Sequence, residues 1–219
     1  MQPYKAVLFD LDGTLINTLE DLAAASNYAL AAYGYPPRPV EDFKMLAGNG
    51  VAVMLERAMP AGEATAQRVA GLKEKFLEYY GVHYADKTRP YPGVPELLRV
   101  LKEKGYKRAV VTNKVEEMAK VILNKLYPDC FDLIMGQRDG VPTKPDPTLA
   151  HMAMDQLGVK PEECVFMGDS GVDVQTAVNS GALPVGVLWG FREEKELREN
   201  GAKRIIRQAH ELLDILEEA

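Results

Sequence analysis

Features that would mark a membrane protein, a disulfide scaffold or a nucleic-acid-binding protein are scarce in this sequence. Its 219 residues include two cysteines, Cys130 and Cys164, without CxxC spacing, so neither a disulfide framework nor a thiolate metal site is indicated. No apolar run reaches the roughly 18 residues of a membrane span. The net charge of −6 opposes long-range attraction of nucleic acid. The first residues lack a signal-peptide pattern. We therefore expect a cytoplasmic protein that binds neither membrane nor nucleic acid; its oligomeric state cannot be read from the sequence.

Short apolar stretches alternate with helical patterns along most of the chain. The stretches suit buried parallel strands and cover residues 4–9, 107–112, 131–135, 163–167 and 183–189. Between them, apolar residues at helical spacing predict helices over residues 94–104, 115–126, 148–157 and 173–180. This alternation predicts an α/β fold with a doubly wound, Rossmann-like parallel sheet.

One region breaks this alternation. Between residues 16 and 87 no convincing strand occurs, and helices are expected over residues 19–33, 51–59 and 63–80. Residues 88–93 are rich in turn formers and lead back to the core. We therefore expect an α/β core of residues 1–15 and 88–219, with an all-helical cap of residues 16–87 as a lid.

Polar side chains gather where the expected strands end. They are Asp10, Asp12, Thr112, Lys144, Asp169 and Asp173. Open α/β sheets bind ligands at the carboxyl ends of their strands. Two carboxylates about 4 Å apart repel by roughly 4 kcal/mol at an effective dielectric of 20, so such a cluster takes up protons or a hard cation. Carboxylate oxygens suit Mg²⁺, which is the expected cofactor.

Four short motifs carry a family resemblance that covers the whole chain. They are Asp10-Leu11-Asp12-Gly13-Thr14, Thr112-Asn113, Lys144-Pro145-Asp146 and Gly168-Asp169-Ser170-Gly171-Val172-Asp173. Together, and in this order, they resemble the haloacid dehalogenase superfamily. A shorter segment, Gly48-Asn49-Gly50 followed by Glu56-Arg57-Ala58, resembles the lid of phosphoglycolate phosphatases.

The resemblance implies a phosphatase with an aspartyl-phosphate intermediate. Asp10 would be the nucleophile, and Asp12 would protonate the leaving group and then activate water. Mg²⁺ would bind the Asp10 and Asp169 side chains and the Asp12 carbonyl. The phosphoryl oxygens would contact Thr112, Lys144 and the backbone N–H groups of Leu11 and Asn113. Asp173 would orient Lys144 or a metal-bound water, Ser170 would act similarly, and Asn49 would contribute to substrate specificity.

Other interpretations remain open from sequence alone. Haloacid dehalogenases resemble this chain but lack the second acid of the first motif. The presence of Asp12 therefore favours a phosphate ester as the substrate. Sugar phosphomutases also resemble this chain, but they carry a lid histidine at the position that Leu22 occupies here. We expect a small phosphorylated metabolite as substrate, with 2-phosphoglycolate as the best guess. The alternative functions are a pyrophosphatase, a nucleotidase, a mutase and a non-catalytic binding module. For Asp173 and Thr112, a helix-capping role is the alternative.

Overall fold

Six short strands form one sheet in the computed structural model, which describes residues 3–218. The strand order is β5-β4-β1-β6-β7-β8, and neighbouring strands run parallel. Their bounds are β1 Ala6–Phe9, β4 Lys107–Val115, β5 Leu133–Gln137, β6 Cys164–Gly168, β7 Leu183–Val187 and β8 Arg204–Ile206. All four side chains of β1 are buried, as expected for a central strand covered on both faces. The predicted α/β fold class is confirmed.

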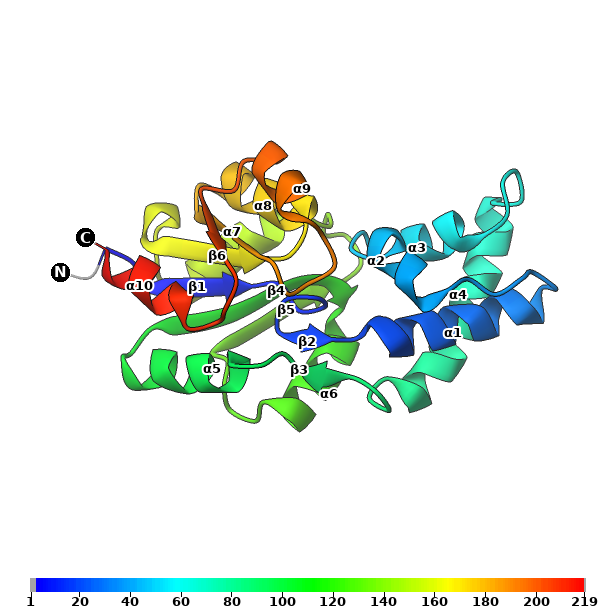
Figure 1. The fold of residues 1–219 in the computed structure, drawn as a ribbon, viewed down its shortest axis with the longest axis horizontal. Coiled ribbons are helices and arrows are strands. Elements are labelled where there is room, and N and C mark those ends of the chain that lie inside the picture. Colours follow the sequence, from blue (N-terminus) through cyan, green and yellow to red (C-terminus); the bar gives the residue numbers. More distant parts are fainter. Residues whose placement is uncertain (1–2, 219) are drawn as a thin grey trace. The chain divides into compact units, whose positions relative to one another are not determined.

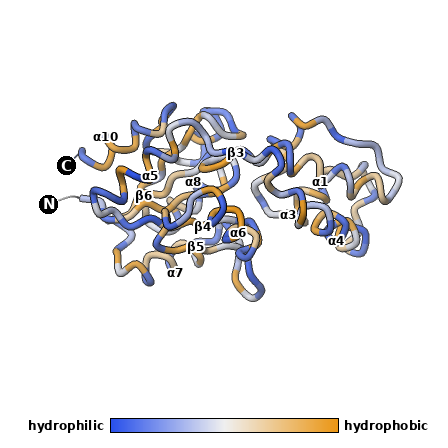
Figure 2. The backbone as a smooth tube through the Cα atoms, turned by 90° about the horizontal axis from the view of Figure 1, so that it is seen from below, coloured by the Kyte–Doolittle hydropathy of each residue, from blue (hydrophilic) through white to orange (hydrophobic). Residues whose placement is uncertain are grey.

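Helices cover both faces of this sheet (Figure 1). In Figure 1, α5 and α6 lie on one side, and α7 and α8 on the other. Leu8, Val111 and Phe166 pack with Ala150 and Met154 of α7 in one apolar cluster, and the hydrophobic tube segments of Figure 2 follow the central strands. The helix bounds are α5 Val94–Glu103, α6 Glu116–Leu126, α7 Thr148–Leu157, η2 Pro161–Glu163, α8 Gly171–Ser180, α9 Glu194–Glu199 and α10 Glu211–Glu217.

A second compact unit is inserted after the first strand and is built from helices. It covers residues 17–89, while the sheet unit covers 1–16 and 90–219. The boundaries expected from the sequence lie between residues 15 and 16 and between residues 87 and 88. The core of the inserted unit is formed mainly where α1 packs against α4. Within α4, the buried rings of Phe76 and Tyr80 stack with centroids 5.1 Å apart. Its elements are α1 Leu19–Ala32, η1 Val40–Asp42, α2 Phe43–Leu46, α3 Val51–Ala58 and α4 Ala66–His83.

Two very short strands lie in the segments that connect the units. β2 (Ile16–Asn17) pairs with β3 (Arg89–Pro90). The prediction of no strand between residues 16 and 87 is therefore wrong for β2, because two residues are too few to show a strand pattern. Next to them, the buried Asp21 carboxylate accepts the N–H groups of Lys87 and Thr88 at 3.1 and 2.8 Å.

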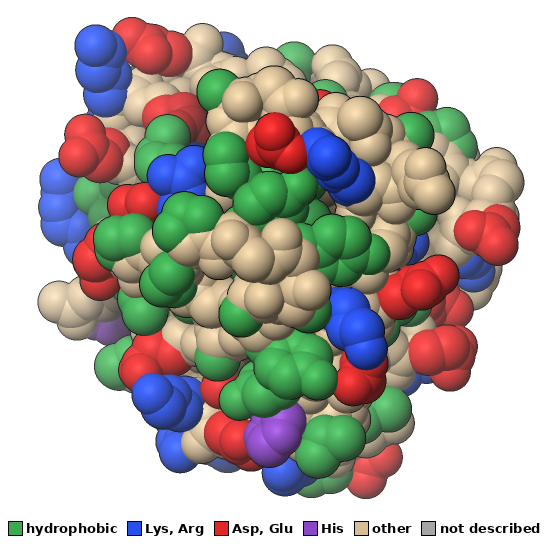
Figure 3. All heavy atoms as spheres, turned by 90° about the vertical axis from the view of Figure 1, so that its right-hand side faces the viewer, with side chains coloured by type: hydrophobic (Ala, Val, Ile, Leu, Met, Phe, Trp, Pro, Cys, Tyr) green, Lys and Arg blue, Asp and Glu red, His purple; other side chains and the backbone are tan. Residues whose placement is uncertain are grey.

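Surface charge is mixed on the face of the molecule drawn in Figure 3. Acidic and basic side chains alternate there with hydrophobic ones, and neither sign forms a continuous field on that face. Among the described residues, no helix is both long and apolar enough to cross a membrane.

Candidate active site

Two of the expected site residues, Asp10 and Asp169, directly follow β1 and β6, and a third, Thr112, lies within the neighbouring strand β4. Phe9 at the end of β1 is in register with Val110 of β4 and Met167 of β6. Because parallel strands end at the same edge of a sheet, Asp10, Thr112 and Asp169 come together at this edge. All three side chains are buried.

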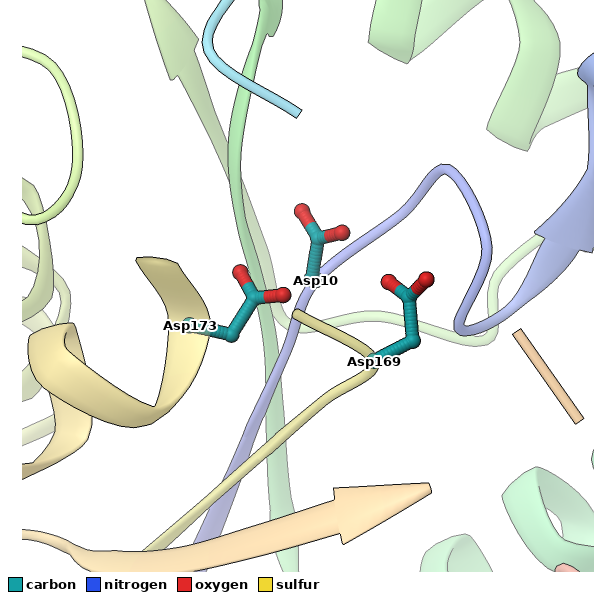
Figure 4. Close-up of side chains that lie close together, drawn as sticks. All are labelled: Asp10, Asp169 and Asp173. Atoms are coloured by element: carbon teal, nitrogen blue, oxygen red, sulfur yellow. The ribbon is translucent and has the colours of Figure 1, made fainter. Parts of the chain in front are cut away.

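Asp10, Asp169 and Asp173 form a buried acidic cluster. Their carboxyl groups converge in Figure 4, and one oxygen from each lies within 4.8 Å of the others. Burial and the charge of Asp173 raise the pKa of Asp10 to about 7, although Lys144 opposes this shift. Burial and the charges of Asp173 and Asp10 raise the pKa of Asp169 well above its ordinary value. The cluster thus holds protons unless a cation balances it.

Lys144 supplies one balancing charge. It lies between β5 and α7, with its Nζ 2.6 Å from Oδ1 of Asp10 and 2.6 Å from Oδ1 of Asp173. Burial opposes the charged ammonium, but the charges of these two carboxylates raise the pKa of Lys144 above its ordinary value. The Lys144 side chain is only 1% exposed, so it belongs to the interior of the site and not to the surface.

Asp173 has a structural role in addition to its contact with Lys144. Its N–H group donates to Oγ of Ser170 at 3.4 Å, and its Oδ2 accepts from the Ser170 N–H and hydroxyl at 3.0 and 2.6 Å. This reciprocal arrangement is a capping box at the start of α8. Both oxygens of Asp173 therefore already have protein partners. The capping interpretation and the expected contact with Lys144 both apply to this residue.

Asp169 is held by contacts that were not predicted from the sequence. Its Oδ1 accepts from the Thr14 hydroxyl at 3.2 Å, and its Oδ2 accepts from the Phe191 N–H at 2.7 Å. A Cβ atom at Gly13 would lie 2.3 Å from Oδ2 of Asp169, and one at Gly190 would lie 2.3 Å from its Cβ. Glycine at both positions is what allows the backbone to approach this carboxylate. The sequence signal for Gly190 was only its place after an apolar strand.

The Asn113 side chain fastens the segment that carries Lys144. Its Oδ1 accepts from the Lys144 N–H at 2.8 Å, and its Nδ2 donates to the Lys144 carbonyl at 3.1 Å. From the sequence, Asn113 was expected to contact phosphate only through its backbone N–H. Its neighbour Thr112 accepts from the Lys114 N–H at 3.1 Å, whereas α6 begins at Glu116. Thr112 therefore does not cap that helix.

A further lysine, Lys114, pairs with Asp12. Its Nζ lies 3.0 and 3.2 Å from the two Asp12 oxygens, and the two side chains are 6% and 20% exposed. Lys114 was not predicted from the sequence because the expected strand stopped at Thr112, while β4 continues to Val115. Leu11, which precedes Asp12, lies in a tight loop in which its carbonyl accepts the N–H groups of residues 14–16. The expected contact between the Leu11 N–H group and phosphate stays a prediction.

Asn49 belongs to the inserted unit. It lies between Gly48 and Gly50, whose φ angles are +110° and +84°, and its Oδ1 accepts from Arg57 at 3.0 Å. Both glycines therefore have left-handed backbone conformations, which glycine adopts without steric cost. A specificity role for Asn49 stays a prediction.

The donor set fits a divalent cation. Asp10, Asp12, Asp169 and Asp173 carry four carboxyl groups, and Lys144 and Lys114 carry two ammonium groups. If all six groups are ionised, two negative charges remain, which one divalent ion neutralises. Oxygen donors without nitrogen or sulfur are typical of hard ions such as Mg²⁺. Asp173 accepts from the Lys144 ammonium and from two Ser170 donors, whereas each oxygen of Asp169 accepts from one uncharged donor and keeps a second lone pair. Asp10 and Asp169 are therefore the better candidates for direct ligands.

Comparison with known proteins agrees with this geometry. Residues 7–187 match the family model described as haloacid dehalogenase-like hydrolase. The chain belongs to this family. It is 34% identical over 220 residues to a phosphoglycolate phosphatase of Haemophilus influenzae, covering 97% of this chain and 98% of the relative. It is also 33% identical over 217 residues to an N-acetylmuramic acid 6-phosphate phosphatase of Pseudomonas aeruginosa, covering 98% and 96% of the two chains.

A solved structure agrees as well. A provisionally named phosphoglycolate phosphatase from Lactobacillus delbrueckii subsp. bulgaricus superimposes with a TM-score of 0.93 at 36% identity, covering 99% of this chain and all of the other. The family prediction from the four motifs is confirmed. The relatives support a phosphoric monoester hydrolase that acts on a small phosphorylated substrate, and the family supports a divalent metal cofactor in general.

Proposed function

We propose that this chain is a Mg²⁺-dependent phosphatase that hydrolyses the phosphate monoester of a small metabolite, with 2-phosphoglycolate as the leading candidate. The observation that carries the proposal is the contact between Lys144 and Asp10, with their atoms 2.6 Å apart in a buried acidic cluster. Such a cluster supports the assignment of a nucleophilic carboxylate, a phosphoryl-binding cation and metal-binding oxygens to one site.

Asp10 is the proposed nucleophile. One of its carboxylate oxygens attacks phosphorus, the bond to the ester oxygen breaks, and an aspartyl-phosphate forms on Asp10. Lys144 and the Thr112 hydroxyl bind the phosphoryl oxygens and stabilise the charge that is spread over them in the transition state. Backbone N–H groups of Leu11 and Asn113 complete these contacts.

Asp12 is the proposed general acid and base. It donates a proton to the departing ester oxygen, so that an alcohol leaves. It then takes a proton from the water that attacks phosphorus, and inorganic phosphate and free Asp10 result. General acid–base assistance of this kind accelerates a reaction by roughly 10²–10⁴-fold.

Mg²⁺ would be held by the Asp10 and Asp169 side chains and the Asp12 carbonyl. When bound, it would supply positive charge that offsets the repulsion between a carboxylate nucleophile and a phosphate dianion. Asp173 and Ser170 act indirectly, since the capping box fixes the carboxylate that holds Lys144.

The test combines one variant, one chelator and a substrate panel. The wild-type protein is expected to hydrolyse p-nitrophenyl phosphate with Mg²⁺ and to lose this activity in excess EDTA. Asp10→Asn should be folded and without measurable turnover. A folded Asp10→Asn protein that retains substantial activity would remove Asp10 as nucleophile, and full activity in EDTA would refute the metal requirement.

A sugar phosphate is the second substrate candidate. The relative from Pseudomonas aeruginosa, which is named for N-acetylmuramic acid 6-phosphate, is nearly as similar to this chain as the phosphoglycolate phosphatases. Measuring kcat/KM for 2-phosphoglycolate, hexose 6-phosphates, nucleotides and pyrophosphate separates these substrates. Replacing Asn49 with Ala across the same panel tests its role in specificity. An isomerisation assay with glucose 1-phosphate tests the mutase alternative. The cytoplasmic location that we expect from the sequence stays a prediction.

A further inference from the structure

Lys114 is a buried cation that the proposed phosphatase steps leave without a task. Its side chain is 6% exposed and contacts both oxygens of Asp12, at 3.0 and 3.2 Å. Lys144, by contrast, contacts Asp10 and Asp173. The two lysines therefore serve different parts of the site. Lys144 lies at the nucleophile, and Lys114 lies at the proposed proton donor.

A lysine beside the proton donor lies beside the leaving group. Asp12 can protonate the ester oxygen only from hydrogen-bond distance, which is roughly 3 Å. Because Nζ of Lys114 is 3.0 Å from an Asp12 oxygen, Lys114 is then at most about 6 Å from the ester oxygen. Its positive charge is therefore close enough to contact a group on the departing side of the substrate.

This distance matches one class of leaving group. If a carboxylate is attached to the carbon that bears the ester oxygen, its oxygens lie about 3 Å from that ester oxygen, since the intervening bonds are about 1.2–1.5 Å long. A charge-assisted hydrogen bond of about 2.8 Å spans the remaining gap to Nζ. An ammonium group has three N–H donors and can bind two anions at once, so this contact does not require Lys114 to leave Asp12.

We propose that Lys114 binds an anionic group on the leaving side of the substrate and thereby selects phosphate monoesters with a carboxylate one carbon from the ester oxygen. The inference rests on the proposed phosphatase function and names the substrate class of the same site. Burying the charged Lys114 ammonium away from water has a high desolvation cost, and contact with a second anion helps to offset that cost. A leaving group without charge offers no such contact.

The test compares two esters that differ in one charge. Wild-type protein with Mg²⁺ is given 2-phosphoglycolate and its carboxyl methyl ester, and kcat/KM is measured for both. We expect a preference of roughly 10- to 100-fold for the charged ester, which is the range for a hydrogen bond to a charged group. A ratio near one would overturn the inference, and this comparison does not depend on any variant folding.

Two matched variants assign the preference to Lys114. In Lys114→Met, both esters should react more slowly because Asp12 loses its partner, and the ratio should fall below about 3-fold, mainly through KM for the charged ester. Lys107→Met replaces an exposed lysine at the other end of the same strand and should keep the wild-type ratio. A folded Lys114→Met protein that retains the full preference would also overturn the inference. Failure of the wild type to hydrolyse both esters and p-nitrophenyl phosphate would instead refute the proposed function, and with it this inference.

Discussion

Asp10→Asn is expected to make the metal-free protein more stable while it abolishes turnover. Burial and neighbouring acids raise the pKa of Asp10 from 3.8 to about 7, so the folded state holds this proton more tightly than the unfolded state does. Stability of the metal-free protein therefore falls as pH rises from about 4 to 7, and the full loss is present above pH 7. Asparagine resembles the protonated carboxyl group and does not suffer this loss.

The size of the effect follows from the pKa shift. A shift of about three pKa units corresponds to about 4 kcal/mol, since each unit is worth about 1.4 kcal/mol. At pH 8 the Asp10→Asn protein should exceed the wild type by about 4 kcal/mol in free energy of unfolding. At pH 5 the linkage relation reduces this difference to under about 2 kcal/mol. For a chain of this length, each kcal/mol corresponds to roughly 2–4 °C in Tm.

The assay is denaturant unfolding in EDTA at pH 5, 6.5 and 8, with a thermal melt at each pH. Asp155→Asn is the control, because it makes the same chemical change on an exposed face of α7 and should follow the wild-type pH dependence. Adding Mg²⁺ should stabilise the wild type far more than Asp10→Asn, and more at pH 8 than at pH 6. An Asp10→Asn protein that is less stable than wild type at pH 8, or a difference that does not shrink toward pH 5, would refute this reasoning.

Three further substitutions test how the site is held. Asn113→Ala removes both side-chain hydrogen bonds to the Lys144 backbone and should lower kcat at least 10-fold, measured with p-nitrophenyl phosphate; an unchanged kcat would show that Lys144 is positioned without it. Ser170→Ala removes a helix cap and should lower stability by about 1 kcal/mol in denaturant unfolding; an effect below about 0.3 kcal/mol would contradict this. Gly13→Ala places a Cβ atom 2.3 Å from Asp169 and should weaken Mg²⁺ binding in calorimetry; wild-type affinity would show that Asp169 is not a ligand.

Local sequence patterns were sufficient to predict the fold class and the strand-end residues. Apolar runs such as residues 4–9 have the length and composition of buried strands, and the topology then brings Asp10 and Asp169 together. Helix 148–157 was predicted with both ends correct, because Gly158 ends it in a left-handed conformation, with φ +67°. The short α2 and β8 were missed, since three or four residues show no periodicity.

Residues that act through long-range contacts were harder to predict. Phe191 follows Asp169 by 22 positions and donates through its backbone N–H, which any residue type except proline could do. Its side chain therefore carries no signal of the contact. Asn113 lay inside a recognised motif, but its side-chain bonds to Lys144 bridge 31 positions and depend on how two loops meet in space.

The charge arrangement of the site explains why its lysines and its acids must be considered together. Two of the four acids, Asp10 and Asp169, have raised pKa values even with Lys144 in place, so the lysines alone do not keep the cluster ionised. A nucleophilic carboxylate at neutral pH therefore needs additional positive charge, which a divalent cation can supply. The same deficit predicts that protons and metal compete for Asp10. Metal affinity should accordingly weaken as pH falls from 8 to 6, and calorimetry with Mg²⁺ that showed no such dependence would mean that Asp10 is already ionised without metal.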